Sequence, residues 1–226
     1  MNNFMTHYYQ QIKKIKEFGS VDYIKFKYQN KFVTFRLVDT SEETIRHLTN
    51  WRKNNRFMFG TNFEMSEKRT LDWIEHNLNE KKDWILFIIN IDGKQYGNMG
   101  TDLYDEKNNS AILDNIMKEP SFNYPGLMTI VEKVYLKWMF DELKLSKISG
   151  DLFTDNYKMM NLHYKCGWKI TNSIPLKKIY TEDGWKWEEM KLQSEEDYGE
   201  RYFWHLEITK EKLMEKMGDI EYEILY

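Results

Sequence analysis

The fold of this chain is decided by the stretch Ala111-Ile-Leu-Asp-Asn-Ile-Met-Lys-Glu-Pro120 and its continuation Ser121-Phe-Asn-Tyr-Pro-Gly126-Leu-Met128. Residues 112–117 are mostly apolar, which is typical of a largely buried strand. Pro120 ends that strand because proline donates no ladder hydrogen bond and favours extended geometry in the residue before it. Pro125 suits the first turn of a helix, where its missing N–H costs nothing. The stretch therefore predicts a strand, a turn and a helix.

The start of this helix is a candidate phosphate site. Gly126, Leu127 and Met128 would leave backbone N–H groups facing outward from the first turn. Such a helix end carries about +0.5 elementary charge and binds phosphate without a basic side chain. A Pro-Gly helix start alone is more often a plain helix start, so the sequence that follows decides between the two.

A second strand and a second helix follow the first pair. Residues 148–153 are a predicted strand, and Asn156 opens a helix that ends at Gly167, the residue type expected after a helix C-terminus. Trp168 then begins another strand over residues 169–172. The order strand, glycine turn, helix, strand, helix is therefore predicted for residues 111–168.

Taken together, the stretch resembles the acetyl-CoA-binding half of the GNAT superfamily of N-acetyltransferases. In that family a proline ends the fourth strand, (Gln/Arg)-x-x-Gly-x-(Gly/Ala) opens a helix, and Asn-x-x-Ala-x-x-Leu-Tyr-x-x-x-Gly-(Phe/Trp) follows later. The matching positions are Pro120, Gly126, Asn156, Leu162, Gly167 and Trp168. The departures are Asn123 for Gln or Arg, Met128 for a small residue, Met159 for Ala, and His163 for Tyr, with Tyr164 one residue later.

The resemblance covers roughly residues 32–192 and implies an α+β fold. It implies a central, mixed, mostly antiparallel and twisted sheet of about seven strands flanked by helices. The rest of the chain agrees with this order. Predicted strands at residues 22–28, 32–38, 83–89 and 95–103, with helices after Ser41 and Ser66, precede the stretch described above.

The resemblance also implies acetyl-CoA or another short acyl-CoA as co-substrate, and no metal. The strand before Pro120 would bond the pantetheine arm through its backbone, and the helix start would bind the diphosphate. The expected donor contacts are Ile116, Met117, Lys118, Asn123, Pro125, Gly126, Leu127, Met128 and Asn156.

Acyl transfer from a thioester to an amine needs a base for the amine and benefits from an acid for the departing thiolate. His163 is the first candidate for the acid, and Tyr164 is the alternative. Asp114 is the first candidate for the base and Asp151 the second, because a carboxylate is otherwise out of place in a buried strand. The alternatives are a structural helix histidine and carboxylates paired with an Arg or a Tyr hydroxyl.

The acceptor side is expected in the stretch Trp51-Arg-Lys-Asn-Asn-Arg-Phe-Met-Phe-Gly60. In the branch of the family that the chain resembles, this stretch lines the acceptor site. The expected substrate contacts are Trp51, Arg52, Asn54, Arg56 and Phe57. Core or rim packing is the alternative for the two aromatic residues, and a solvated surface position is the alternative for the two arginines.

The chain is similar to bacterial enzymes that acylate amino sugars on a nucleotide carrier. This similarity implies a dTDP- or UDP-linked amino deoxysugar as acceptor, in the synthesis of lipopolysaccharide or another surface polysaccharide. The alternatives are N-terminal acetylation of a protein, acetylation of an aminoglycoside, and a non-catalytic module that binds CoA or a partner protein. An acyl group larger than acetyl is compatible with the sequence.

Composition limits the remaining choices. The net charge of −3 gives no reason to expect nucleic acid or an anionic membrane as partner. The single cysteine, Cys166, fits a reducing cytoplasm. No apolar run approaches the roughly 20 residues of a membrane span, and residues 1–20 lack the apolar segment of a signal peptide. The five histidines lack metal-ligand spacing.

The length of 226 residues suits one domain with extensions. We expect an N-terminal extension over residues 1–30, the acyltransferase domain over 31–193 and a charged helical extension over 194–226. The first 20 residues are predicted to form a helix. Both extensions are expected to cover a surface or to contact a second subunit in a homodimer.

Overall fold

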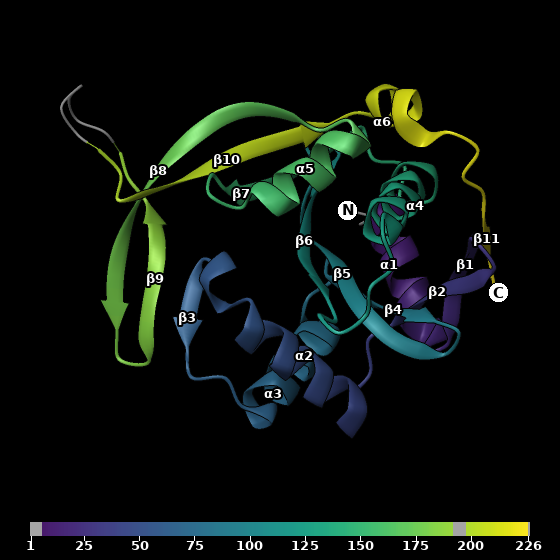
Figure 1. Cartoon of the computed structure of the whole chain (residues 1–226), viewed down its shortest axis with the longest axis horizontal. Coiled ribbons are helices and arrows are strands. Elements are labelled where there is room, and N and C mark those ends of the chain that lie inside the picture. Colours follow the sequence, from purple (N-terminus) through teal and green to yellow (C-terminus); the bar gives the residue numbers. More distant parts are fainter. Residues whose placement is uncertain (1–5, 192–197, 226) are drawn as a thin grey trace, which may run out of the picture.

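The computed structural model describes residues 6–191 and 198–225, and within them eleven strands form one sheet (Figure 1). The strand order is β11-β1-β2-β4-β5-β6-β7-β10-β8-β9-β3. The strands are β1 Asp22–Tyr28, β2 Lys31–Leu37, β3 Thr61–Phe63, β4 Ile85–Ile91, β5 Lys94–Asp105, β6 Ser110–Lys118, β7 Lys147–Phe153, β8 Lys169–Thr181, β9 Gly184–Glu189, β10 Arg201–Ile208 and β11 Tyr222–Ile224. The pairing of β6 with β7 is parallel, and the other described pairs are antiparallel.

Helices cover both faces of the sheet. They are α1 His7–Phe18, α2 Glu42–Asn54, α3 Glu67–Glu80, α4 Leu127–Asp141, α5 Tyr157–Cys166 and α6 Lys210–Met217, with a short 3-10 helix η1 at Arg56–Met58. The larger core lies on the face with α1, α4, α5 and α6, and the smaller core lies under α2 and α3. The two cores share β4, which is buried along its whole length because alternate side chains enter opposite cores.

The local signals in the sequence explain the element boundaries. Ser41 and Ser66 cap α2 and α3 by accepting hydrogen bonds from the amides of Thr44 and Arg69. The helix predicted over residues 1–20 is α1, which buries Tyr8, Ile12 and Ile15, and residues 1–5 lie outside the described chain. The mixed, mostly antiparallel sheet is confirmed.

Two expectations need correction. The sheet has eleven strands rather than about seven, because β1 and β11 extend one edge and β3 pairs with β9 at the other. Within the expected extension 194–226, of which residues 194–197 and 226 lie outside the described chain, residues 198–225 are not simply helical. Residues 201–208 form β10, which lies inside the sheet between β7 and β8. In β10, Phe203 and His205 point to one face of the sheet, and Leu206 and Ile208 point to the other, where they lie in the larger core. This alternation with a period of two is the pattern of a strand, and it decides the structure against the helical spacing of the apolar residues.

Candidate active site

The parallel strands β6 and β7 separate after a short paired section. They form three residue pairs, of which the last is Ile112↔Ser149, whereas β6 continues to Lys118 and β7 to Phe153. Beyond that pair, β6 stays paired with β5 and β7 with β10. No strand of residues 6–191 or 198–225 fills the wedge between them. The facing edges therefore offer backbone groups to an extended ligand.

A β-bulge bends β6 as it leaves β7. The pairs Asn98↔Met117 and Gly100↔Asp114 set one residue of β5 against two of β6, and Asn115 has a φ of 53°. The fully buried Asn98 side chain donates to the Asn115 carbonyl and holds the bulge. Because a bulge bends its strand and increases the twist, it explains the opening of the wedge.

The turn before α4 lies beside this wedge. Gly126 caps the helix in the left-handed conformation, with φ 81° and ψ −9°. The Leu127 amide donates to the Tyr124 carbonyl at 3.2 Å. The amides of Gly126 and Met128 have no hydrogen-bond acceptor among the described residues. These two amides lie at the positive end of a helix and can bind an anion.

A pocket of about 290 Å³ lies against this turn. Lys118 from β6 and Lys158 and Lys165 from α5 line it together with Gly126. The Tyr28 hydroxyl donates to the Pro125 carbonyl at 2.6 Å and fixes the turn. Three ammonium groups beside two free amides suit a chain of phosphates.

The structure brings most of the predicted donor contacts together. The pocket is lined by Lys118, Asn123, Pro125, Gly126 and Met128. Ile116 and Met117 lie on β6 along the wedge. Leu127 does not fit its prediction, because its side chain is fully buried and its amide closes the turn. The Asn156 side chain accepts from the Met159 amide at 3.4 Å, so its oxygen caps α5 instead of facing a ligand.

His163 lies between α5 and α4, on the face of the larger core. Its side chain is 8% exposed, and its Nδ1 is 2.8 Å from Glu132 Oε1. Its ring centroid is 5.2 Å from that of Trp168. The Trp168 ring in turn borders Gly150, one residue beyond the last β6–β7 pair. The Trp168 ring therefore connects His163 to the closed end of the wedge.

Tyr164 does not share this position. It is 67% exposed and lies on the solvent side of α5. Adjacent helical residues point about 100° apart, so Tyr164 faces away from the interface that holds His163. The alternative acid is therefore not supported by its geometry.

Asp114 and Asp151 lie on opposite sides of the wedge and on the face covered by α2 and α3. Each is two residues beyond the last pair, Ile112↔Ser149. Their apolar neighbours in the chain belong to the larger core on the other face, so side-chain alternation points both carboxylates away from it. The base candidates and His163 therefore lie on opposite faces of the same opening.

Asp114 is the better base of the two. Its side chain is exposed to solvent, although many protein atoms surround the carboxyl group. Burial is the main cause that raises the pKa of its carboxyl above 3.8, whereas the Asn115 amide and the Arg52 charge oppose that rise. A carboxylate with a raised pKa binds a proton more readily near neutral pH.

Asp151 has a structural partner. Its Oδ1 is 2.7 Å from Nδ1 of His205, which lies opposite it on β10. The His205 Nε2 is 3.8 Å from Oε1 of Glu207. The Asp151 carboxylate is thus already bonded in a row of polar groups along β10, which fits the structural alternative better than the role of base.

Trp51 is not a substrate contact, and this prediction is wrong. Its side chain is 0% exposed and packs in the smaller core with Ile45 and Leu48. Its Nε1 donates to Glu119 Oε2 at 2.8 Å. The spacing of these three apolar residues along α2 is the helical pattern of a core face.

Arg52, the next residue, turns to the acceptor side and holds β3. Its guanidinium carbon lies 3.3 Å from the Phe59 ring centroid, and its Nη2 donates to the carbonyl and the hydroxyl of Thr61 at 3.0 Å. Burial lowers the pKa of Arg52 to about 10, against the opposing effect of Asp114. Arg52 therefore remains a cation at neutral pH close to the candidate base.

The other predicted substrate contacts lie at the surface after α2. Asn54, Arg56 and Phe57 are exposed, and Arg56 lies 4.7 Å over the Phe57 ring. The Phe57 carbonyl accepts from Arg201 Nη1 at 2.9 Å, and Arg201 also pairs with Asp155 at 2.7 Å. Arg201 thus ties this loop to the turn before α5. The sequence did not indicate Arg201, because its segment was expected to be helical.

An arm formed by β8 and β9 projects from the body and returns to the acceptor side through its pairing with β3 (Figure 1). The register sets Lys178 opposite Trp187 and Tyr180 opposite Trp185, so these four side chains share one face. Lys178 Nζ lies 4.6 Å over the Trp185 ring. The Trp187 ring is 6.4 Å from that of Phe153 on β7. This aromatic row leads from the wedge along the arm.

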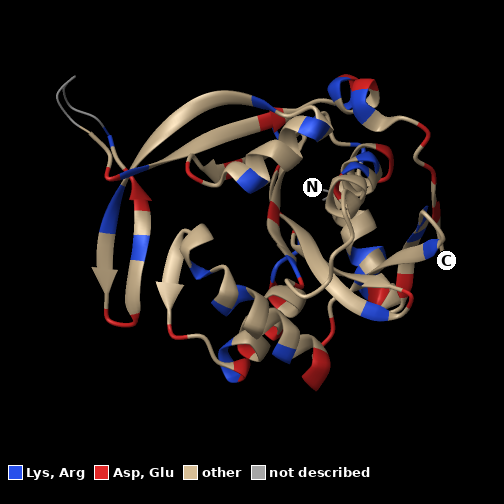
Figure 2. Ribbon diagram, in the orientation of Figure 1, with Lys and Arg blue, Asp and Glu red and all other residues tan. Residues whose placement is uncertain are grey.

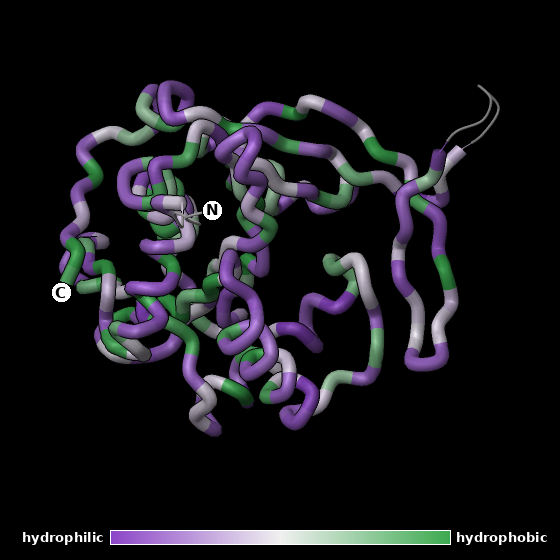
Figure 3. The backbone as a smooth tube through the Cα atoms, turned by 180° about the vertical axis from the view of Figure 1, so that it is seen from behind, coloured by the Kyte–Doolittle hydropathy of each residue, from purple (hydrophilic) through white to green (hydrophobic). Residues whose placement is uncertain are grey.

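The arm carries both signs of charge and mixed hydropathy (Figures 2 and 3). Lysines lie along its two strands, and Glu182 and Asp183 lie at its tip. Hydrophobic residues interrupt a mainly hydrophilic course. Such a surface suits a polar ligand with a planar group better than a purely apolar one.

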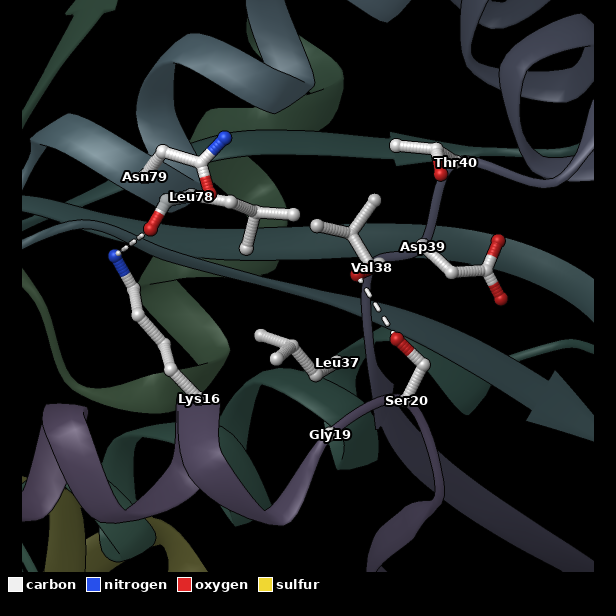
Figure 4. Close-up of a pocket in the computed structure, with 9 residues that line it drawn as sticks. All are labelled: Lys16, Gly19, Ser20, Leu37, Val38, Asp39, Thr40, Leu78 and Asn79. Carbon is white, nitrogen blue, oxygen red and sulfur yellow. Dashed lines mark hydrogen bonds between the residues drawn. The ribbon is translucent and has the colours of Figure 1, made fainter.

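A second pocket, of about 330 Å³, lies away from the wedge between α1, β2 and α3 (Figure 4). Lys16 Nζ donates to carbonyls at the end of α3, including that of Leu78 at 3.0 Å, and Ser20 Oγ donates to the Val38 carbonyl at 3.2 Å. These polar groups are engaged with the protein. Elsewhere, no cluster of three or more His, Cys, Asp or Glu placed to hold a metal was found in residues 6–191 and 198–225.

A sheet that opens at its parallel pair, with a glycine turn at a helix start beside the opening, is the arrangement of an N-acyltransferase of the GNAT fold. The family model described as an acetyltransferase (GNAT) domain matches residues 33–169. This match covers more than half of the chain, so the chain belongs to the GNAT acetyltransferase family. The expected fold, enzyme class and acyl-CoA co-substrate are thereby confirmed. No curated protein sequence matches the chain.

Solved structures share the fold at low sequence identity. Spermidine N-acetyltransferase from Vibrio cholerae, in complex with CoA and spermine, has a TM-score of 0.63 and 14% identity over 80% of this chain and 98% of that one. A chimera of that enzyme with hSSAT has a TM-score of 0.62 and 15% identity over the same shares. Another acetyltransferase has a TM-score of 0.61 and 12% identity over 85% of this chain and 90% of that one. None of the helices in the described residues is long and apolar enough to cross a membrane.

Proposed function

We propose that the protein transfers an acetyl or slightly larger acyl group from acyl-CoA to the amine of a dTDP- or UDP-linked amino deoxysugar, in the cytoplasm, for a surface polysaccharide. The donor half of this proposal follows from family membership and from the wedge. The acceptor half is supported by one observation, namely the cations that lie over aromatic rings around the opening.

Acyl-CoA, the acyl donor, fits the groups at the start of α4 and along the wedge. The two free amides at Gly126 and Met128 and the lysines of the pocket suit the diphosphate of CoA. The free edges of β6 and β7 suit the amides of the pantetheine arm. This path leads the thioester to the closed end of the wedge, between Asp114 on one face and His163 on the other.

The chemistry needs only these two side chains and good positioning. Asp114 takes a proton from the attacking amine, directly or through a water, and the raised pKa of its carboxyl suits it for this role. His163 gives a proton to the departing sulfur. Holding two bound reactants in the wedge contributes to the rate because a bimolecular step becomes effectively unimolecular.

The acceptor is inferred from charge. Arg52 lies over Phe59, Arg201 over Phe153, and Lys178 over Trp185. Guanidinium and ammonium groups beside aromatic rings suit a diphosphate and a nucleobase. A polyamine, which is cationic along its length, is repelled by these three cations.

Polyamine acetylation is the competing function, because the structures with the same fold include a complex of spermidine N-acetyltransferase with spermine. The test is steady-state thiol release from acetyl-CoA with a panel of acceptors. The panel contains dTDP- and UDP-linked amino deoxysugars, spermidine, an aminoglycoside and a ribosomal-protein N-terminal peptide. Release with the nucleotide-linked sugars alone supports the proposal. Release with spermidine but not with the sugars overturns it.

Calorimetric titration of CoA tests the donor half of the proposal, and an absence of CoA binding would overturn it. Binding of CoA without release from any acceptor in the panel would overturn the proposed acceptor and would fit either another amine or a non-catalytic module that binds CoA. His163→Ala is expected to lower turnover far more than CoA affinity, because His163 contacts the Trp168 ring at the closed end of the wedge and does not line the phosphate pocket. Unchanged turnover would remove His163 from the mechanism.

A further inference from the structure

Glu132 is a buried acidic residue that the steps above do not use. It lies on α4 and is 0% exposed. Its Oε1 accepts from Trp168 Nε1 at 2.7 Å and lies 2.8 Å from His163 Nδ1. Its Oε2 is buried and has no hydrogen-bond partner in the described chain. A carboxylate in such a place costs free energy unless a cation balances it.

The groups around Glu132 indicate which cation this is. From α5 it faces His163 and the Cys166 thiol, and burial together with the Glu132 charge raises the pKa of that thiol and keeps it neutral. From α4 the nearby ammonium group is that of Lys133, which donates to the Lys216 carbonyl on α6. Next to β8, Glu132 accepts from the indole of Trp168, which does not titrate. His163 is therefore the ionisable partner in hydrogen-bonding contact.

We propose that Glu132 is a positioning residue that holds His163 with Nδ1 protonated, so that Nε2 serves the sulfur of acyl-CoA. The proposal rests on the function proposed above, in which His163 supplies the proton. A carboxylate that accepts from Nδ1–H fixes the orientation of the ring and stabilises its protonated form. The second bond, from Trp168, keeps the carboxylate itself in place.

The proton balance follows from this arrangement. The C–N bond forms as the C–S bond breaks, and the electron pair of the C–S bond goes to sulfur. The amine proton passes to Asp114, and the proton on His163 Nε2 passes to sulfur. His163 becomes neutral, retains its Nδ1 proton against Glu132, and regains the Nε2 proton from solvent before the next turnover.

Glu132→Gln is the decisive variant because it keeps the size of the side chain and an oxygen for Trp168 but removes the charge. We expect turnover to fall about 10–100-fold, with KM for acetyl-CoA unchanged. Glu132→Asp keeps the charge at a shorter reach and should recover part of the turnover. Glu142→Gln, at the C-terminal cap of α4, is the matched control and should match the wild type.

A measurement that needs no acceptor substrate tests the pairing of Glu132 with His163 independently of the proposed function. Long-range ¹H–¹⁵N spectra of the full chain report the tautomer and charge of His163, whose signals are assigned by their loss in His163→Gln. We expect the tautomer of His163 with a proton on Nδ1 to be less populated in Glu132→Gln than in the wild type. If the spectra and turnover of Glu132→Gln equal those of the wild type, or if only its Tm falls, Glu132 is merely structural. If no acceptor reacts but the spectra change as expected, the pairing stands and the proposed function fails.

Discussion

The side of the wedge that binds acyl-CoA is formed mainly by backbone groups, whereas the side that binds the acceptor is formed mainly by side chains. On the donor side, backbone geometry forms the site through the left-handed turn at Gly126, the bulge at Asn115 and the free edge of β6. On the acceptor side, side chains from distant elements meet, such as Arg52 from α2 and Arg201 from β10. The turn before α4 carries a Pro-Gly pair that can be recognised in the sequence, whereas a group of side chains from several elements requires no motif. Proteins built in this way are therefore expected to share the acyl-CoA donor and to differ in the amine that they accept.

The largest effect is expected where the two sides meet. Asp114→Asn should lower kcat/KM about 10²–10⁴-fold because it removes the base. Asp151→Asn should lower it far less, since Asp151 is already bonded to His205. Thiol release measures both. An equal loss of kcat/KM in the two variants would contradict the assignment of Asp114 rather than Asp151 as the base.

A smaller effect is expected from the backbone of the donor side. Gly126→Ala places a Cβ in open space but forces an L-residue to a φ of 81°, which costs roughly 1–2 kcal/mol. If the turn relaxes and its two amides lose alignment, CoA affinity should fall about tenfold. Calorimetric titration measures it. Gly93→Ala is the control, with φ 79° and open space in the β4–β5 turn, and it should leave CoA affinity unchanged.

The charge of the acceptor side is tested by Lys178→Gln. For an anionic nucleotide-linked acceptor, KM should rise about 2–5-fold, as expected for a partly exposed charge. For spermidine the same change should lower KM, so the sign identifies the class of acceptor. Lys177→Gln is the matched control, because Lys177 is exposed on the opposite face of the arm. A rise in KM with Lys177→Gln as well would indicate a general charge effect.

Trp51→Phe tests whether the first residue of the predicted acceptor stretch belongs to the core. The loss of its hydrogen bond to Glu119 should lower stability by about 1–3 kcal/mol. The acceptor KM should not change. Urea unfolding and steady-state kinetics measure the two quantities. A raised KM with unchanged stability would return Trp51 to the acceptor site.

The smallest effect concerns stability and pH. Burial raises the pKa of Asp114 above 3.8 in the folded protein, so the unfolded chain loses this proton at lower pH than the folded one. Stability therefore falls as pH rises from 3.8 through the folded pKa. Asp114→Asn removes this loss, so its Tm should exceed that of the wild type at pH 7 and approach it below pH 3.8. Scanning calorimetry over this range measures the difference, and a lower Tm at pH 7 would contradict the raised pKa of Asp114.

Much of the fold could be predicted because its signals are local. Ser41, Ser66 and Gly167 act within one helical turn of their own position, and each stands where its element begins or ends. Strand β3 could not be predicted in this way. It has three residues and exists because it pairs with β9, more than 100 positions later in the chain. Long-range pairing of this kind leaves no periodicity in a short segment.

The site shows the same division. The spacing from Asn156 indicates His163 as a candidate, but nothing in the sequence indicates its contact with Glu132, which lies 31 positions away and carries no motif. Trp51 was assigned to the acceptor site by resemblance, although its spacing from Ile45 and Leu48 along one helix indicated the core. Where a resemblance and a helical pattern disagree, burial of a large apolar ring decides the outcome.

The place of β10 in the sheet has a consequence for how the chain is made. Because β10 separates β7 from β8, the strands β8, β9 and β3 cannot join the remainder of the sheet until residue 208 has left the ribosome. Until then the nascent polypeptide exposes two unpaired edges, which are templates for aggregation. A premature stop codon before β10 is therefore expected to yield a product for chaperones and proteases instead of a shortened enzyme.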